Sequence, residues 1–205
     1  MRRDEIIASI PKSYNDIAHA AVPSGIGALV ILWCLVSVSF SYWMIPVVAL
    51  TLFVCFGFEW FVHRYVLHAS FPLLSIIHRK HIQHHMIYTD QDMAMRSRKE
   101  LHLILMPAYA IVAVLLFIAP VITIIGLLFG TAAAKIVLTT MMVFFLAYEW
   151  LHYAYHHPPG TLISRSRIIQ TLKENHRKHH NPKVMQRYNF NVTFPIFDWI
   201  MKTKI

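Results

Sequence analysis

Two long tracts of this 205-residue chain contain no charged side chain. They run from Ala20 to Phe58 and from Leu101 to Ala134, and the mean hydropathy of the whole chain is +0.49. A helix that crosses a bilayer needs roughly 20 apolar residues, so each tract is long enough for two spans. The sequence therefore predicts an all-α integral membrane protein with four transmembrane helices in two hairpins.

Turn signals place the bends of these hairpins near residues 41–46 and 126–131. The predicted spans are residues 24–40, 46–61, 101–125 and 132–151, and Lys135 is expected to reach the membrane surface. Cys34 and Cys55 lie in apolar sequence and are interpreted as small buried side chains. The polar start of the chain argues against a cleavable signal peptide. We expect residues 1–205 to form one domain.

The basic residues are confined to the segments outside the spans. The net charge is +9, and 18 of the 19 Lys and Arg residues lie in residues 1–23, 62–100 and 152–205. With four spans these segments share one side of the membrane, which the positive-inside rule predicts to be cytoplasmic. This distribution explains the surplus charge by topology and attraction to anionic lipid, so a nucleic-acid partner is not expected. The membrane is predicted to be a bacterial inner membrane or the endoplasmic reticulum, with residues 62–100 and 152–205 forming a cytoplasmic cap.

Ten of the 14 histidines form four clusters near the ends of the apolar tracts. The clusters are His63 and His68; His81, His84 and His85; His152 and His156; and His176, His179 and His180. Residues at i, i+3 and i+4 share a helix face, so each triad presents three imidazoles over an arc of roughly 100°. The first pair is five residues apart, roughly 140° around a regular helix, so its members either bind different ions or lie where the helix bends.

Converging imidazoles suit Zn, Cu, Fe and Ni. Ten exceed what one ion can coordinate, so the sequence predicts two ions in a shared site, with iron and zinc both compatible. His19, His78, His102 and His157 are not needed by the spacing and are interpreted as lying outside it. Ligating histidines usually donate their other ring N–H to a carboxylate or carbonyl. The candidate carboxylates are Glu59, Glu149, Asp90, Asp92 and Asp198.

Two other classes of metalloprotein fit the sequence less well. Transporters hold ions near the bilayer midplane, usually at broken helices, whereas these clusters lie at or beyond the span ends. Zinc hydrolases need an open coordination position and a general-base carboxylate, and ten imidazoles give little sign of either. A membrane zinc-binding or transport protein remains the alternative from a different class.

The arrangement resembles the fatty acid hydroxylase / sterol desaturase superfamily of integral-membrane di-iron enzymes. The resemblance runs from about Glu59 to the C-terminus and is carried by the four histidine motifs in order and by residues 189–198. Where the family usually has Gly in that last segment this chain has Asn191, and it has Lys202-Thr203 for the usual Gly-Thr. The first and third motifs are most similar to those of fatty acid 2-hydroxylases. His157 also gives His152 the His-x4-His spacing of carotenoid ring hydroxylases.

The resemblance implies a function and its cofactors. It implies hydroxylation of a lipid acyl chain at C2 by two irons and O2, with the ten clustered histidines as metal ligands, no further catalytic residue, and zinc able to replace iron on purification. It also implies a membrane lipid substrate and a separate electron donor, either cytochrome b5-like or ferredoxin-like. Hydroxylation or desaturation of a carotenoid or sterol is the alternative within the superfamily, and the sequence leaves the oligomeric state open.

Overall fold

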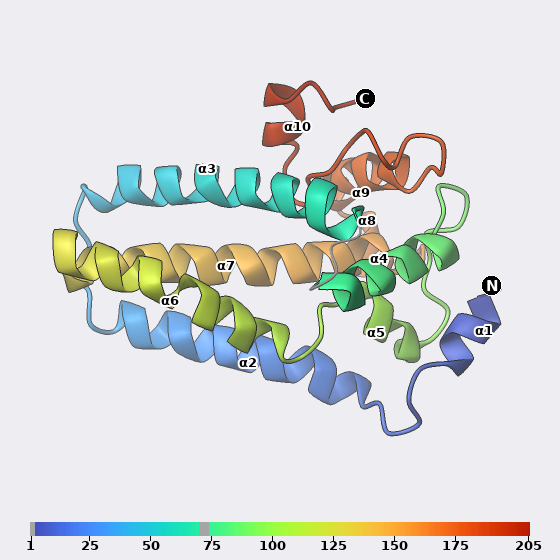
Figure 1. Ribbon diagram of the computed structural model, residues 1–205, viewed down its shortest axis with the longest axis horizontal. Coiled ribbons are helices and arrows are strands. Elements are labelled where there is room, and N and C mark those ends of the chain that lie inside the picture. The colour runs from blue at the N-terminus through green and yellow to red at the C-terminus, as the bar shows by residue number, and fades with distance from the viewer. Residues whose placement is uncertain (1–2, 70–73) are drawn as a thin grey trace. The chain divides into compact units, whose positions relative to one another are not determined.

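The computed structural model of the protein describes residues 3–69 and 74–205 (Figure 1). Four residues of the predicted cap, 70–73, lie outside the described part of the chain. The described residues are helical apart from loops and one isolated bridge between Thr89 and Asp92. The elements are α1 (Arg3–Ala8), α2 (Asp16–Leu35), α3 (Met44–Val62), η1 (His63–Leu67), α4 (Ser75–Ile87), η3 (Arg98–Glu100), α5 (Leu101–Ile104), α6 (Ala110–Phe129), α7 (Thr131–Tyr155), α8 (Leu162–Arg165), α9 (Arg167–His179) and α10 (Ile196–Ile200).

Four of these helices are long and apolar enough to cross a membrane, which confirms the predicted all-α fold with four candidate spans. They are Asp16–Leu35, Met44–Leu67 (α3 with η1), Ala110–Phe129 and Thr131–Tyr155. Their outward side chains are apolar, as lipid requires. Leu29, Phe53, Leu116 and Leu127, for example, are all largely exposed. The chain is therefore an integral membrane protein.

The boundaries of two spans differ from those predicted. The first span begins at Asp16 rather than near Ser24, because a short polar opening continues into the apolar stretch as one helix that tolerates Pro23 in its interior. The third begins at Ala110 rather than Leu101. Residues 101–104 instead form the separate helix α5, and the chain leaves the helical conformation before Pro107, as the residue ahead of a proline tends to do.

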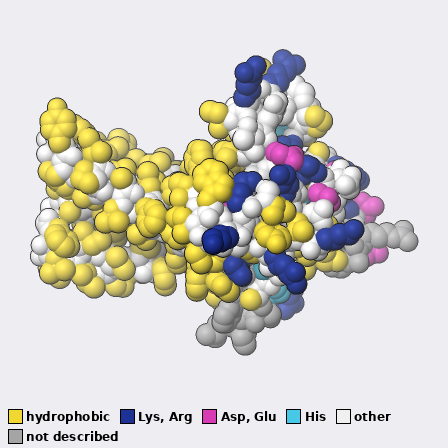
Figure 2. All heavy atoms as spheres, turned by 90° about the horizontal axis from the view of Figure 1, so that it is seen from above, with side chains coloured by type: hydrophobic (Ala, Val, Ile, Leu, Met, Phe, Trp, Pro, Cys, Tyr) yellow, Lys and Arg dark blue, Asp and Glu magenta, His cyan; other side chains and the backbone are white. Residues whose placement is uncertain are grey.

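The chain divides into two compact units. Unit 1 contains residues 1–16, 56–105 and 148–205, and unit 2 contains residues 17–55 and 106–147. Two of the four boundaries fall inside α3 and α7, a third follows the first residue of α2, and the fourth lies in the loop between α5 and α6. On the face seen in Figure 2, Lys and Arg side chains gather over unit 1.

Unit 2 is a bundle of apolar helices. Its core consists of Ile111, Ile118 and Met142, with side chains of α2, α6 and α7 packed around them. Gly27 lets α2 approach α7, because an added Cβ would lie 3.0 Å from the Leu146 side chain. Gly130 joins α6 to α7 with a φ of +87°, a conformation that favours glycine.

Unit 1 contains the cap elements and all ten clustered histidines. A small core of Tyr155, Leu172 and Val192 joins α7, α9 and the C-terminal loop. The Tyr155 hydroxyl donates to the Val192 carbonyl over 2.9 Å. These contacts fix α9, which contains His176 and His179 and is followed by the C-cap residue His180, against the end of the fourth span.

Candidate metal centre

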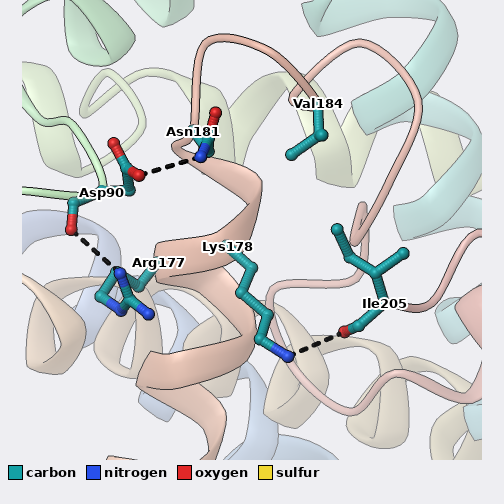
Figure 3. A pocket seen from close by; sticks show the side chains of 6 residues that line it. All are labelled: Asp90, Arg177, Lys178, Asn181, Val184 and Ile205. Carbon is teal, nitrogen blue, oxygen red and sulfur yellow. Dashed lines mark hydrogen bonds between the residues drawn. The ribbon is translucent and has the colours of Figure 1, made fainter.

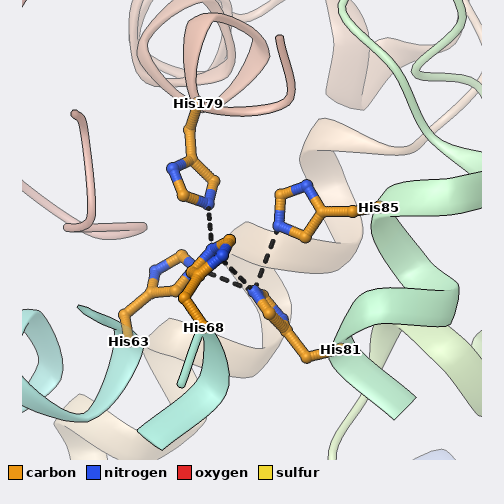
Figure 4. A group of neighbouring side chains, drawn as sticks. All are labelled: His63, His68, His81, His85 and His179. Carbon is orange, nitrogen blue, oxygen red and sulfur yellow. Dashed lines mark hydrogen bonds between the residues drawn. The ribbon is translucent and has the colours of Figure 1, made fainter. Parts of the chain in front are cut away.

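The ten clustered histidines assemble into two groups of five. Group A contains His63, His68, His81, His85 and His179, and group B contains His84, His152, His156, His176 and His180. Within each group, one ring nitrogen from every member lies within 4.8 Å of the others. Figure 4 shows the five rings of group A pointing toward one another from three elements of the chain.

Each group is built by the same rule. It takes one pair from the end of a span, one i, i+4 pair from a cap helix, and one single histidine from the other cap helix. In group A the cap pair comes from α4 and the single His179 from α9; in group B the cap pair comes from α9 and the single His84 from α4. Each sequence triad is therefore divided between the two groups, because its i+3 member faces the neighbouring group.

A local change of helix type brings His63 and His68 together. Residues 63–67 form a π-helix, and the His68 amide donates to the His63 carbonyl over 3.2 Å, an i to i+5 bond. A residue five positions on then returns to nearly the same face, which a regular α-helix would not allow. This is the bend that the five-residue spacing left open, and it places both rings in group A.

The Nε2 atoms face inward in both groups. In group A the Nε2 atoms of His68 and His179 are 3.0 Å apart, and that of His81 is 3.1 Å from that of His85. In group B the Nε2 atom of His180 lies 3.0 Å from that of His176 and 3.2 Å from that of His84. The two groups adjoin, since the rings of His85 and His180 stack with centroids 4.2 Å apart.

Backbone carbonyls hold four of the rings from behind. The Nδ1 atom of His63 contacts the Phe190 carbonyl and that of His179 contacts the Tyr188 carbonyl. In group B, His180 contacts the Tyr88 carbonyl over 2.7 Å and His156 contacts the Met93 carbonyl over 2.9 Å. A carbonyl oxygen can only accept a hydrogen bond, so each of these Nδ1 atoms carries the ring proton. The Nε2 atom of each neutral ring then has a free lone pair.

Burial keeps the rings neutral. It lowers the pKa of His68 to about 2 and that of His179 to about 4. Six further histidines of the two groups have a pKa well below the ordinary value, and burial is the largest cause for each. They are His81, His84, His85, His156, His176 and His180. Neutral imidazole is the form that binds a metal ion.

These observations fit two transition-metal ions. Lone pairs on several Nε2 atoms converge in each group, and they repel one another unless a cation lies among them. The Nε2 atom of His156 is buried and has no hydrogen-bond partner within residues 3–69 and 74–205. The donor set is all nitrogen, which suits iron and zinc alike. The two groups could thus each hold one ion.

The remaining histidines lie outside both groups. His78 contacts the Leu67 carbonyl, His157 contacts the Thr161 hydroxyl, and His19 contacts the Met106 carbonyl. His102 packs edge-on against Tyr14. The spacing of His157 from His152 therefore does not reflect a place in the metal centre of this chain.

The expectation that carboxylates orient the ligands is wrong for Glu59. Its carboxylate accepts from the backbone of Val192 and Thr193 and from the side chains of Thr193 and Asn191, over 2.6–3.0 Å. Asp198 similarly accepts from the amides of Phe190 and Asn191. These carboxylates hold the loop whose carbonyls then hold the rings. Asp90 accepts from Asn181, and Asp92 pairs with Arg3 and Arg96.

Glu100, which was not among the carboxylates expected from the sequence, supports group B. Glu100 is buried and accepts from the Tyr88 hydroxyl over 2.7 Å, from the Arg96 amide and from the Arg3 guanidinium. Arg3 also donates to the Ala94 carbonyl over 2.9 Å. Together they hold residues 88–94, whose carbonyls contact His180 and His156. The one feature of the sequence that could have pointed to Glu100 is its position directly before the uncharged tract that begins at Leu101.

The departures in the C-terminal motif have structural counterparts. Lys202 stands where the resemblance leads one to expect Gly, and its φ is +56°, the left-handed region that favours glycine. Asn191 replaces the other Gly, and its side-chain carbonyl accepts from the amides of Phe197 and Asp198 at the start of α10. This chain therefore accommodates Lys202 in a left-handed conformation and ties Asn191 to the start of α10 by two hydrogen bonds.

The family model for fatty acid hydroxylase matches residues 47–203. The chain belongs to the fatty acid hydroxylase family. The matched region contains all ten histidines of groups A and B.

One solved structure has a similar fold. It is described as full-length scs7p with only the hydroxylase domain visible, and the match has a TM-score of 0.63 at 18% sequence identity. The alignment covers 90% of this chain and 65% of that one, so this chain spans slightly less than two thirds of the relative. No curated protein sequence matched the chain.

Proposed function

We propose that this protein is an O2-dependent lipid hydroxylase that inserts a hydroxyl group into an acyl chain, at C2 of a fatty acid or sphingolipid acyl group. The observation that carries the proposal is the pair of adjoining five-histidine groups within a chain of this family. The likeness of the His63 and His152 motifs to those of fatty acid 2-hydroxylases supports the C2 position.

The ten histidines of groups A and B would hold two irons. Bound there, the irons would supply the oxidising power, drawn from O2, that hydroxylation of an unactivated C–H bond requires. The chain itself orients the rings through the Phe190, Tyr188, Tyr88 and Met93 carbonyls and keeps them neutral by burial. It also limits access of water, because nine of the ten side chains are buried. This exclusion protects the reacting carbon from side reactions.

Exchange of His179 for Ala tests the proposal in cells. Cells that express the wild type are expected to contain acyl lipids heavier by one oxygen, with the hydroxyl placed at C2 by fragmentation, and the variant is expected to lose them completely. Lipid mass spectrometry at matched protein level provides the measurement. His157→Ala is the matched control, since His157 adjoins the site but lies outside both groups. It should retain the product.

Three other results would count against parts of this assignment. A product lighter by two hydrogens would indicate desaturation instead. A product from His179→Ala would separate the reaction from group A. Unchanged acyl lipids in cells with a competent electron donor would contradict an acyl substrate.

We also propose that a separate, acidic electron carrier docks on the exposed side of α9. This helix has His176 and His179 in its last turn and His180 as its C-cap residue. Arg177, which also pairs with Glu174, and Lys178 stand between them. Figure 3 shows these two basic residues beside a pocket of about 210 Å³ that is also lined by Asn181 and Val184. Opposite charge speeds encounter with a partner, and this effect weakens with salt.

Charge reversal checks the docking proposal. Arg177→Glu with Lys178→Glu is expected to slow turnover at least tenfold at low ionic strength, because both docking charges change sign, while the metal content stays unchanged. Lys183→Glu is the control, as Lys183 is exposed on the loop after α9. Turnover is measured with the carrier that the host supplies, over a series of salt concentrations. An unchanged rate with intact metal content would contradict docking at α9.

A further inference from the structure

The C-terminal loop and α10 lie beside a stretch of α3 that belongs to a membrane span. The ring of Phe197 lies directly over Gly57, where an added Cβ would be 2.7 Å from it. Phe194 packs edge-on against Phe56, with ring centroids 6.3 Å apart. Figure 1 shows α10 next to the C-terminal part of α3. The end of the chain therefore returns to the side of a spanning helix.

The position of Gly57 within this helix gives the depth of the contact. The 19 residues of α3 rise about 28 Å at 1.5 Å each, close to the roughly 30 Å of a bilayer's hydrocarbon core. Gly57 is five residues before Val62, so it lies about 8 Å inside the end of the helix. Arg64, which stacks over Trp60, lies in η1 in the last turn of this span and is its first basic residue.

The loop of residues 190–198 has protein hydrogen-bond partners for backbone amides that water could not reach at that depth. Irregular backbone within a membrane requires that its polar groups be satisfied by the protein. The amides of residues 190 and 191 donate to Asp198, and those of residues 192 and 193 donate to Glu59. The amides of residues 197 and 198 donate to the side chain of Asn191. Two buried carboxylates thus replace the water that such a loop would otherwise need.

The outer side of the same segment is apolar. Trp199 is 62% exposed, Ile200 52% and Phe194 48%. The adjoining part of α3 also exposes Phe58 and Phe61. Lys202 and Lys204 follow, so the polarity changes from apolar to basic over a few residues. Tryptophan followed by lysine is the pattern of a membrane–water interface with anionic headgroups.

We propose that residues 190–201 form a re-entrant segment that enters the bilayer beside α3, with Phe194, Trp199 and Ile200 in contact with lipid acyl chains. The occupant of this apolar face is lipid, because the face continues the lipid-facing surface of a membrane span. Lys202 and Lys204 return the chain to the headgroups. The loop that orients His63 and His179 is thereby anchored in the membrane itself.

Spin labels at three positions test this placement in reconstituted vesicles. The labelled variants are Ile200→Cys, Phe58→Cys as the lipid-facing reference, and Lys183→Cys as the aqueous reference. Cys34 and Cys55 are buried, and the unsubstituted chain measures any labelling at them. Relaxation of each label by O2, which concentrates in lipid, is compared with relaxation by a water-soluble nickel chelate.

The label at position 200 is expected to match that at position 58, with a high ratio of O2 to nickel accessibility. A ratio like that at position 183 would place α10 in water and overturn the proposal. Low accessibility to both reagents would also overturn it, since the face would then be covered by protein. Brominated lipids give a second measurement that needs no label: Trp199→Phe should reduce the quenchable tryptophan fluorescence, and an unchanged quenchable signal would contradict lipid contact.

Discussion

Replacement of Glu59 by Gln is expected to remove one of the two metal ions, the one in group A. The carboxylate accepts four hydrogen bonds from the loop of residues 191–193, and an amide turns one of its two acceptors into a donor that faces N–H and O–H groups. Each buried donor left unpaired costs about 1–3 kcal/mol. The loop is then expected to shift, and with it the Phe190 carbonyl that orients His63.

Metal analysis of the purified Glu59→Gln variant should give one ion per chain where the wild type gives two. The lost ion is identified by combining variants. With His63→Ala and His68→Ala, which remove a pair of group A, the count should stay at one, because both changes act on the same ion. A variant that keeps two ions, or a combination that falls to none, would contradict the assignment of Glu59 to group A.

Replacement of Glu100 by Gln is expected to have the complementary effect. Glu100 accepts from the Tyr88 hydroxyl, the Arg96 amide and the Arg3 guanidinium, and it holds the segment whose carbonyls contact His180 and His156. Glu100→Gln removes the buried partner of Arg3, and the pairing of Arg3 with the partly exposed Asp92 remains. The loss of stability is therefore expected to stay at or below about 3–5 kcal/mol, which is what breaking a buried ion pair costs. The loss of metal should fall on group B, since the carbonyls of Tyr88 and Met93 in this segment contact His180 and His156 of that group.

This variant should also contain one ion per chain, but its combinations should differ. Glu100→Gln together with His63→Ala and His68→Ala is expected to contain none, because the changes remove different ions. The double variant Glu59→Gln and Glu100→Gln should likewise contain none. Retention of one ion in either combination would show that Glu59 and Glu100 do not support separate metal sites. Asp90→Asn is a matched control, because the Asp90 carboxylate accepts from the side chains of Asn181 and Gln91 and its hydrogen bonds do not lead to Glu59 or Glu100.

Much of the candidate site could be predicted from spacing, because metal ligands must share a helix face. All ten clustered histidines lie in the two groups, and His78 and His157 lie outside them. Which group each ring joins could not be predicted, because the i+3 member of a triad turns toward whatever helix packs beside it. The π-helix at residues 63–67 could not be predicted either, since a five-residue spacing permits either a bend in the helix or two histidines that bind different ions.

The fold, too, could be predicted from the sequence only in part. Apolar tract length predicted four spans, and the four candidate helices confirm them. The third boundary was misplaced because residues 101–104 belong to the same uncharged tract as the span, and the non-helical residues 105–109, which include Pro107, separate the two helices. The role of Glu59 was misassigned because its partners are 132–134 positions away in sequence, in a loop that helical periodicity cannot locate. Long-range pairing of a carboxylate with backbone amides leaves no local pattern.

The metal content of wild-type protein extracted gently from its membrane shows whether each group of five histidines holds one metal ion. X-ray absorption at the edge of the metal found then identifies the ligands. We expect two ions per chain, each ligated by imidazole nitrogen and without sulfur. One ion per chain, none, or a coordination shell dominated by carboxylate oxygen or thiolate would contradict this expectation.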